Sequence, residues 1–257
     1  MKDISAVIFD LDDTLLRSDK SISDYTLEVL KKCRECGIYT GIATARSEIS
    51  AGSFIRAEDF DIVISNGGAR MIIGGKCVYK KMMSADTVRK IIDVFFGIGG
   101  EEITVETEEN YFWNYKIKPE GSWAHAVYND FSNLNSPAYK ITAQLDTPEL
   151  AQHICNEVSG IETLSFRGEK WRRFAAVGAD KVSAIHAATK HLGISTSQIA
   201  AFGDDYNDIE MIKAVGMGVA MGNAIKEVKT IAKHITFSND EDGAARFIAD
   251  NILCVEL

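Results

Sequence analysis

Four short polar segments, far apart in the chain, share one feature that limits the possible folds. Three of them directly follow an apolar run typical of a buried strand. The segments are residues 10–15, 43–46, 180–181 and 202–208. In an open parallel α/β sheet, segments that follow the carboxyl ends of the strands gather at one edge, where ligands bind. We therefore predict a single site assembled from all four segments.

The order of expected elements divides the chain into a core and an insert. Strands and helices alternate up to about residue 80 and again from residue 180, which favours βαβ units on a parallel sheet. The expected elements of the first part are strands at 4–9, 38–43 and 61–65 and helices at about 24–36 and 47–58. Between the two parts, strand-like runs are interrupted by single helices. We predict an α/β fold with a core of residues 1–80 and 178–257 and an inserted α+β cap of residues 81–177.

Composition and charge restrict the class of partner. The chain is 46% hydrophobic and 25% charged, as is ordinary for a globular protein. Its net charge of −9 disfavours nucleic acid and anionic membranes. We see no apolar signal segment and no run of about 18 apolar residues. Five scattered cysteines suit a reducing compartment, so we expect a cytoplasmic protein, and nothing indicates an obligate protein partner.

The first polar segment carries two carboxylates, Asp10 and Asp12, at the end of the first expected strand. Side chains two residues apart on an extended chain point the same way. One carboxylate can attack phosphorus, and the other can give a proton to the leaving oxygen and later take one from water. An Asp-x-Asp pair is common, however, and by itself it fits an ordinary capped strand end better than a catalytic pair.

The other segments offer groups that bind phosphate and metal. Thr44 lies where a strand passes into a helix, and free N–H groups at a helix start bind anions. Lys181 could neutralise phosphate charge. Asp204, Asp205 and Asp208 repel one another unless a cation or hydrogen-bond donors compensate, and Mg²⁺ prefers such oxygen ligands. Taken singly, these features also fit a helix cap, a surface lysine and an acidic helix start.

In this order, the segments resemble the four motifs of the haloacid dehalogenase (HAD) superfamily, and its Cof-type phosphatases in particular. The matching stretches are FDLDDTLL at 9–16, IATAR at 42–46, Lys181, and FGDDYNDIEM at 202–211. Two further stretches, 218–224 and 239–243, resemble other Cof-type signatures. The resemblance implies a Rossmann-like parallel-sheet core with the cap inserted between the second and third motifs, which agrees with the division predicted above.

The resemblance also implies a role for each matching residue. Asp10 would be the nucleophile and a magnesium ligand. Asp12 would be the general acid and base, with its backbone carbonyl on the metal. Asp204 would be a further ligand of Mg²⁺, and Asp208 would support the metal directly or through water.

Four other residues would hold the substrate phosphate, as the same resemblance implies. They are Thr44, the amide of Ala45, Lys181 and Asn207. The implied enzyme is a magnesium-dependent phosphatase that hydrolyses small phosphate monoesters, such as sugar phosphates, nucleotides or phosphorylated cofactors, through an aspartyl-phosphate.

Three other functions fit parts of the pattern. A phosphomutase would use the same aspartyl-phosphate, and a regulatory protein could bind a phospholigand and keep only residual phosphatase activity. Halide displacement from carbon is disfavoured because a halide needs no proton from Asp12. Retention of all four motifs argues against lost chemistry.

The chain departs from the subfamily pattern at three positions, Asp13, Ala45 and Val182, where glycine is usual. None of these departures removes a reacting group. We expect the cap to select the substrate. Its candidate contacts are Trp113, Tyr115, Trp123, His125, Tyr128, Arg167, Trp171 and Arg172.

Overall fold

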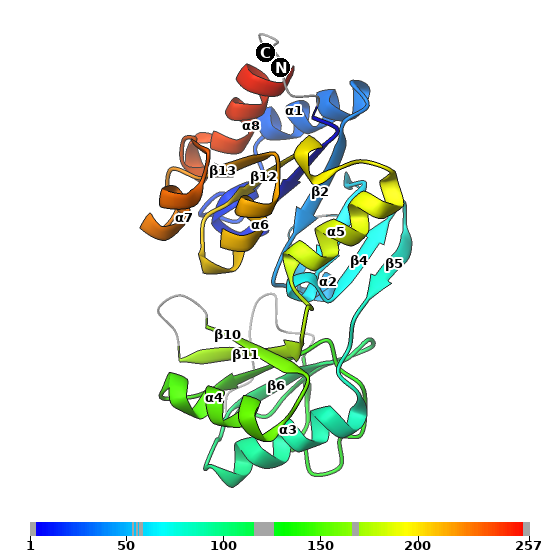
Figure 1. Ribbon diagram of the computed structural model, residues 1–257, viewed down its shortest axis with the longest axis vertical. Coiled ribbons are helices and arrows are strands. Elements are labelled where there is room, and N and C mark those ends of the chain that lie inside the picture. The colour runs from blue at the N-terminus through cyan, green and yellow to red at the C-terminus, as the bar shows by residue number, and fades with distance from the viewer. Residues whose placement is uncertain are drawn as a thin grey trace.

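The computed structural model of the protein describes residues 4–52, 54, 56, 59–115, 126–165 and 170–253. These residues form two lobes, each built around one sheet (Figure 1). The larger lobe contains both ends of the described chain, and the smaller lobe is inserted between β5 (Lys76–Lys80) and α5 (Lys181–Leu192). The structure therefore has the predicted architecture of an α/β core with an inserted cap.

The core sheet is mainly parallel. Its strand order within the described chain is β14-β13-β12-β1-β2-β3-β4-β5. The parallel strands are β1 (Ala6–Phe9), β2 (Tyr39–Ala43), β3 (Ile62–Ser65), β12 (Ile199–Gly203), β13 (Met217–Ala220) and β14 (His234–Ile235). β4 (Arg70–Ile73) and β5 continue the sheet as antiparallel strands. The central strand β1 is buried throughout, as expected for a strand covered on both faces.

Helices cover both faces of the core sheet. They are α1 (Asp24–Glu35), α2 (Glu48–Ala51), α5, α6 (Ile209–Ala214), α7 (Lys226–Ile231) and α8 (Gly243–Ile248). On one face, α1 and α8 pack over Val7 and Phe9, and on the other, α5 packs over Ala6 and Ile8. The alternation along β1 therefore sends successive side chains into two separate hydrophobic layers.

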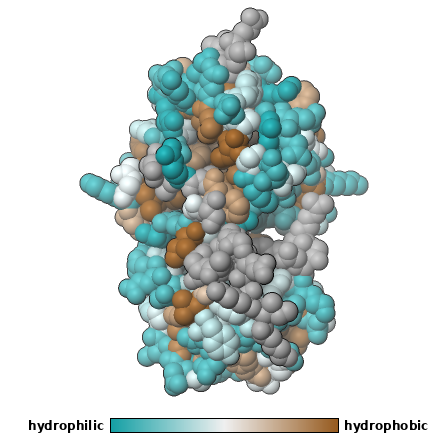
Figure 2. Space-filling model, turned by 180° about the vertical axis from the view of Figure 1, so that it is seen from behind, coloured by the Kyte–Doolittle hydropathy of each residue, from teal (hydrophilic) through white to brown (hydrophobic). Residues whose placement is uncertain are grey.

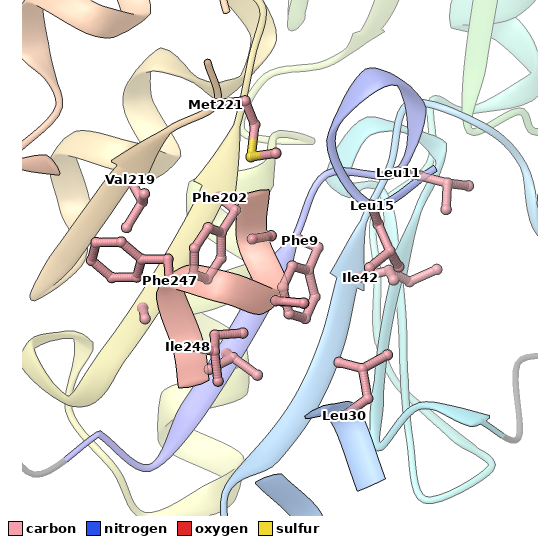
Figure 3. Close-up of a cluster of buried hydrophobic side chains, with 14 of the residues drawn as sticks. Phe9, Leu11, Leu15, Leu30, Ile42, Phe202, Val219, Met221, Phe247 and Ile248 are labelled. Carbon is pink, nitrogen blue, oxygen red and sulfur yellow. The ribbon is translucent and has the colours of Figure 1, made fainter. Parts of the chain in front are cut away.

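Figure 3 shows the layer beneath α1 and α8, where Phe9 of β1 lies beside Phe202 of β12. These rings stack with centroids 5.2 Å apart, and Phe247 meets Phe202 edge-on at 5.8 Å. Burying a phenylalanine side chain contributes about 1.5–3 kcal/mol. This packing fixes β1 against β12 just before their carboxyl ends, where Asp10 and Asp204 follow.

Among the described residues, the cap is a sheet with helices packed on one of its faces. Its strand order is β10-β11-β9-β6-β7-β8. The elements are α3 (Ala85–Gly97), β6 (Ile103–Glu106), β7 (Tyr111–Trp113), β8 (Val127–Tyr128), β9 (Lys140–Gln144), α4 (Pro148–Glu157), β10 (Ile161–Ser165) and β11 (Trp171–Ala176). α3 and α4 pack on the face that carries Ile103, Val105 and Ile141. The opposite face, with Glu106 and Lys140, is turned to the core (Figure 1).

Two details of the core differ from the sequence-based expectation. The helix expected at 47–58 has Ser47 as its cap but ends at Ala51. The hairpin of β4 and β5 was not predicted. Its turn contains Gly74 and Gly75, both with positive φ, as tight two-residue hairpin turns require.

None of the described helices combines the length and the apolar character needed to cross a membrane. On the face seen in Figure 2, described residues are mostly hydrophilic, and hydrophobic ones occur in small groups.

Candidate active site

The predicted segments meet at the edge of the core sheet that faces the cap. β1 lies between β12 and β2, so Asp10, Asp204 and Thr44 follow three neighbouring strands. Lys181 is the first residue of α5, and Asn207 lies in the short turn that follows β12. The parallel strands thus bring together residues that are up to about 200 positions apart in the chain.

Three carboxylates form a buried cluster at this edge. Asp10, Asp204 and Asp208 each offer an oxygen, and these oxygens lie within 4.8 Å of one another. Asp10 and Asp204 are each 6% exposed and Asp208 is fully buried. Burial and the neighbouring carboxylates raise the pKa of Asp204 to about 7, although Thr14 donates a hydrogen bond to it at 3.0 Å. Burial likewise raises the pKa of Asp10, against the attraction of Lys181.

Lys181 joins two members of this cluster. Its Nζ lies 2.5 Å from Oδ1 of Asp10 and 2.6 Å from Oδ1 of Asp208. Burial disfavours the lysine's charge, but Asp10 and Asp208 outweigh it and raise the pKa of Lys181. Lys181 is therefore a fixed cation beside the oxygen that is predicted to attack phosphorus.

Asp208 is held by the backbone of its own segment. Its Oδ2 accepts the N–H groups of Asp204 at 3.0 Å and Asp205 at 3.1 Å. This fold requires Gly203, since a Cβ there would lie 2.5 Å from the Cβ of Asp208. Lys181 and the two N–H groups together contact both oxygens of Asp208. Lys181 contacts only one oxygen of Asp10, and Thr14 only one oxygen of Asp204. Asp10 and Asp204 therefore each have an oxygen left for a metal ion.

The donor set suits a hard divalent cation. It consists of carboxylate oxygens, the ligands that Mg²⁺ and Ca²⁺ prefer. Buried carboxylates with raised pKa values are relieved when a cation binds next to them. The cluster of Asp10, Asp204 and Asp208 is therefore a candidate metal site.

The carboxylate of Asp12 lies in a separate group of charges. Arg46 donates two hydrogen bonds to it, from Nε to Oδ2 at 2.6 Å and from Nη2 to Oδ1 at 2.9 Å. Lys20 adds a third contact at 3.1 Å. Burial would raise the pKa of Asp12, but Arg46 and Lys20 lower it. The structure thus separates the Asp12 side chain, which is one-third exposed, from the buried cluster.

The phosphate-binding segment at the end of β2 is held from the core and from the cap. Within the core, the N–H of Gly67 donates to the carbonyl of Thr44, and Thr44 Oγ1 accepts the N–H of Arg46 at 3.1 Å. From the cap, Lys140 donates to the carbonyl of Ala45 at 2.6 Å. Lys140 is itself paired with Glu106 at 2.9 Å. The cap is therefore joined by a direct hydrogen bond to the phosphate-binding segment of the core.

The structure also describes Asn207 and the three positions, Asp13, Ala45 and Val182, that depart from the subfamily pattern. The side-chain oxygen of Asn207 is buried and has no hydrogen-bond partner among the described residues. Asp13 has φ 55, a left-handed conformation that explains why glycine is usual there. Ala45 is not among the residues of positive φ, so alanine fits without strain. Val182 packs partly buried on α5.

The structure describes five of the eight cap residues that were predicted as candidate substrate contacts. Trp123, His125 and Arg167 lie outside the described residues. The rings of Trp113, Tyr115, Tyr128 and Trp171 contact one another, with centroids 5.4–5.7 Å apart along the series. Arg172 pairs in register with Ala143, on the helix-covered face.

Sequence reasoning missed the cap residues that do reach the core. Besides Lys140, the missed residue is Arg173, whose guanidinium donates to the carbonyl of Ala179. Both lie on strands at positions that alternate with apolar ones. That pattern could have assigned them to the core-facing side of the cap.

The chain and its fold are similar to known proteins. The chain matches the haloacid dehalogenase-like hydrolase family over residues 7–248 and belongs to that family. It is 25% identical to the 5-amino-6-(5-phospho-D-ribitylamino)uracil phosphatase YitU of Bacillus subtilis, covering 95% of this chain and 96% of the relative. It is 27% identical to the HMP-PP phosphatase of Klebsiella pneumoniae, covering 90% and 89%. A haloacid dehalogenase-like hydrolase from Bacteroides thetaiotaomicron has a TM-score of 0.82 at 26% identity, covering 96% and 99%.

These findings confirm the predicted family, the predicted fold class and the prediction of an enzyme. Both named curated relatives are phosphatases of small phosphorylated molecules, which is the predicted class of activity. The individual roles assigned to site residues stay predictions.

Proposed function

We propose that the protein hydrolyses small phosphate monoesters, with Mg²⁺ as cofactor and a phosphorylated Asp10 as intermediate. The observation that carries the proposal is the buried cluster of Asp10, Asp204 and Asp208 with Lys181 bonded across it. A nucleophile, a fixed cation and an oxygen-only ligand set at one point are what phosphoryl transfer to a carboxylate needs.

The residues at the carboxyl edge would share the reaction as follows. The Asp10 oxygen beside Lys181 attacks phosphorus, the bond from phosphorus to the alcohol oxygen breaks, and the other Asp10 oxygen would face the metal ion. Asp12 gives a proton to the departing alcohol oxygen, and then takes one from the water that attacks the phosphorylated Asp10. The guanidinium of Arg46 lowers the pKa of Asp12 and so stabilises its ionised form, which is the form that takes the proton from water.

Metal and phosphate would be held by different groups. Asp10, Asp204 and the backbone carbonyl of Asp12 would bind Mg²⁺, with Asp208 in support. The bound ion supplies charge neutralisation at the phosphoryl oxygens.

The phosphate would lie against the end of β2 and the start of α5. Thr44 Oγ1, the N–H of Ala45, the ammonium of Lys181 and the amide of Asn207 would donate to it. Support comes from the shared position of Ala45, Lys181 and Asn207, which line one pocket.

The division of labour between the lobes is also part of the proposal. Residues 1–80 and 178–257 would supply the chemistry, and residues 81–177 would choose the substrate. A phosphorylated metabolite fits best, since the relatives are named for phosphorylated small molecules. The cytoplasm, where such metabolites occur, is the proposed location.

The experiment that tests this proposal measures hydrolysis of p-nitrophenyl phosphate with Mg²⁺ and after chelation. We expect turnover only with the ion, and none from Asp10→Asn in either condition. A matched control is Asp146→Asn, which removes an exposed cap carboxylate paired with Lys170 and should keep full activity. Equal turnover by Asp10→Asn and the wild type would reject the nucleophile, and full activity without metal would reject the cofactor.

A further inference from the structure

A pocket of about 570 Å³ opens between the cap and the core beside the phosphate-binding residues. The core side of its lining includes Ala45, Lys181 and Asn207, and the cap side includes Glu162, Leu164 and Arg173. Three residues of the proposed phosphate site thus form one end of the pocket. A phosphate bound there would have its alcohol portion within reach of the cap strands β10 and β11.

Arg173 is the buried cation of this pocket. Its side chain is 5% exposed, and its guanidinium donates to the carbonyl of Ala179 at the junction between cap and core. The group lies against Gly67, where a Cβ would come within 2.9 Å of the guanidinium carbon. The backbone of the core turn therefore leaves room for the guanidinium beside the phosphate-binding segment.

The charge of Arg173 is poorly compensated. Two other buried cations, Lys140 and Lys181, have carboxylate oxygens at 2.9 and 2.5 Å. Within the described parts of the chain, Arg173 has no carboxylate in ion-pair contact, and its Nε has no hydrogen-bond partner. Burial lowers the pKa of Arg173, and the more distant Glu162 and Asp180 offset this only in part. A buried cation without a close counter-charge is costly, and an anion entering the pocket would relieve that cost.

We propose that this pocket holds the alcohol portion of the substrate, and that Arg173 binds an anionic oxyacid group on it. The proposal rests on the function proposed above and narrows it to phosphate monoesters that carry a second anionic group, either a carboxylate or another phosphate. A guanidinium is suited to both because its planar N–H groups match their oxygens. Glu162 lines the same pocket and offers an acceptor to a hydroxyl or amino group nearby.

Matched substrates test the proposal and also measure the reach of the pocket. One series carries a phosphate ester at one end and a carboxylate at the other, with increasing chain length. A second series ends in a second phosphate, and a third ends in a neutral hydroxyl. We expect the wild type to prefer an anionic member over its neutral match in kcat/KM by about 10- to 100-fold, the range of a hydrogen bond to a charged group.

The variants Arg173→Gln and Arg173→Lys separate recognition from structure. Arg173→Gln should lose that preference, because kcat/KM should fall for the anionic substrates and much less for their neutral matches. Arg173→Lys should keep a weaker preference, because it retains the charge without the planar group. The control is Arg89→Gln on α3, which removes an ion pair with Asp93 far from the pocket and should leave the preference intact.

The two series of anionic substrates identify which oxyacid is bound, and either one supports the proposal. A wild type that prefers neutral substrates, or hydrolyses matched pairs equally, would overturn it. So would an Arg173→Gln protein that slows every substrate by one common factor, since this would make Arg173 structural. Should Arg173→Gln not fold, the inhibition constants of ω-hydroxycarboxylates and of the matching neutral diols are compared on the wild type. Tighter inhibition by the carboxylates supports the proposal, and equal inhibition overturns it. Hydrolysis of p-nitrophenyl phosphate by the wild type shows that the proposed function stands even where this inference fails.

Discussion

The raised pKa of Asp204 makes the stability of the metal-free protein depend on pH in a defined direction. The folded protein holds a proton on Asp204 up to about pH 7, whereas the unfolded chain releases it near the ordinary value of 3.8. Between these values the folded state binds more protons, so the free energy of unfolding falls as pH rises. The rise from 3.8 to about 7 corresponds to about 4 kcal/mol, at about 1.4 kcal/mol for each pH unit.

The matched comparison is with Asp204→Asn, which keeps the shape and removes the titration. In EDTA, urea unfolding gives the free energy of each protein across the pH range. Groups distant from Asp204 cancel between the two proteins, so the wild type minus the variant should fall by about 4 kcal/mol from about pH 4 to pH 8. The pKa of Asp10, which the charge of Asp204 raises in the wild type, changes the difference in the same direction.

Magnesium should recover much of this loss at the upper end of the range. A cation stabilises the ionised carboxylate, and binding at about 100 times its Kd contributes about 2.7 kcal/mol. The variant should gain less. A difference between the two proteins that stays flat across the pH range in EDTA would refute the argument that burial and neighbouring carboxylates raise the pKa of Asp204.

Three further predictions concern other parts of the site. Asp12→Asn should slow alkyl phosphates far more than an aryl phosphate in steady-state kinetics, because only the poor leaving group needs a proton; equal losses would contradict the acid role. Lys140→Met should lower the free energy of unfolding by about 3–5 kcal/mol, since Glu106 keeps a buried charge, and adding Glu106→Gln should restore part of it in urea titrations. Asp13→Gly should raise stability by up to about 1 kcal/mol with activity retained, because φ 55 suits glycine, and a lower Tm would count against this.

The sequence was sufficient for the parts of the site that depend on strand ends. Asp10, Asp204 and Thr44 each follow an apolar run, and parallel strands place such positions at one edge. Lys181 was predicted to neutralise phosphate charge from the start of a helix, and the motif resemblance implied the same role. Its bonds to Asp10 and Asp208 depend on how α5 packs against the sheet, which no local pattern specifies.

The sequence did not predict the contacts between the two lobes, nor the directions of long side chains. The bond from Lys140 to the carbonyl of Ala45 exists only because the cap docks on the core. The two hydrogen bonds from Arg46 to Asp12 depend on the direction in which the long arginine side chain extends. By contrast, the hairpin at Gly74 and Gly75 had a readable turn signal that was overlooked.

The central claim is that Asp10 becomes phosphorylated during turnover. Its most direct test is to mix the enzyme with a phosphate ester and Mg²⁺, quench in acid within one turnover, and locate phosphate on the protein by peptide mass spectrometry. We predict one added phosphoryl group on the peptide that contains Asp10, formed and lost at rates that account for turnover, and none in Asp10→Asn. Release of phosphate at the full rate from an enzyme that never carries phosphate at Asp10 would contradict the claim.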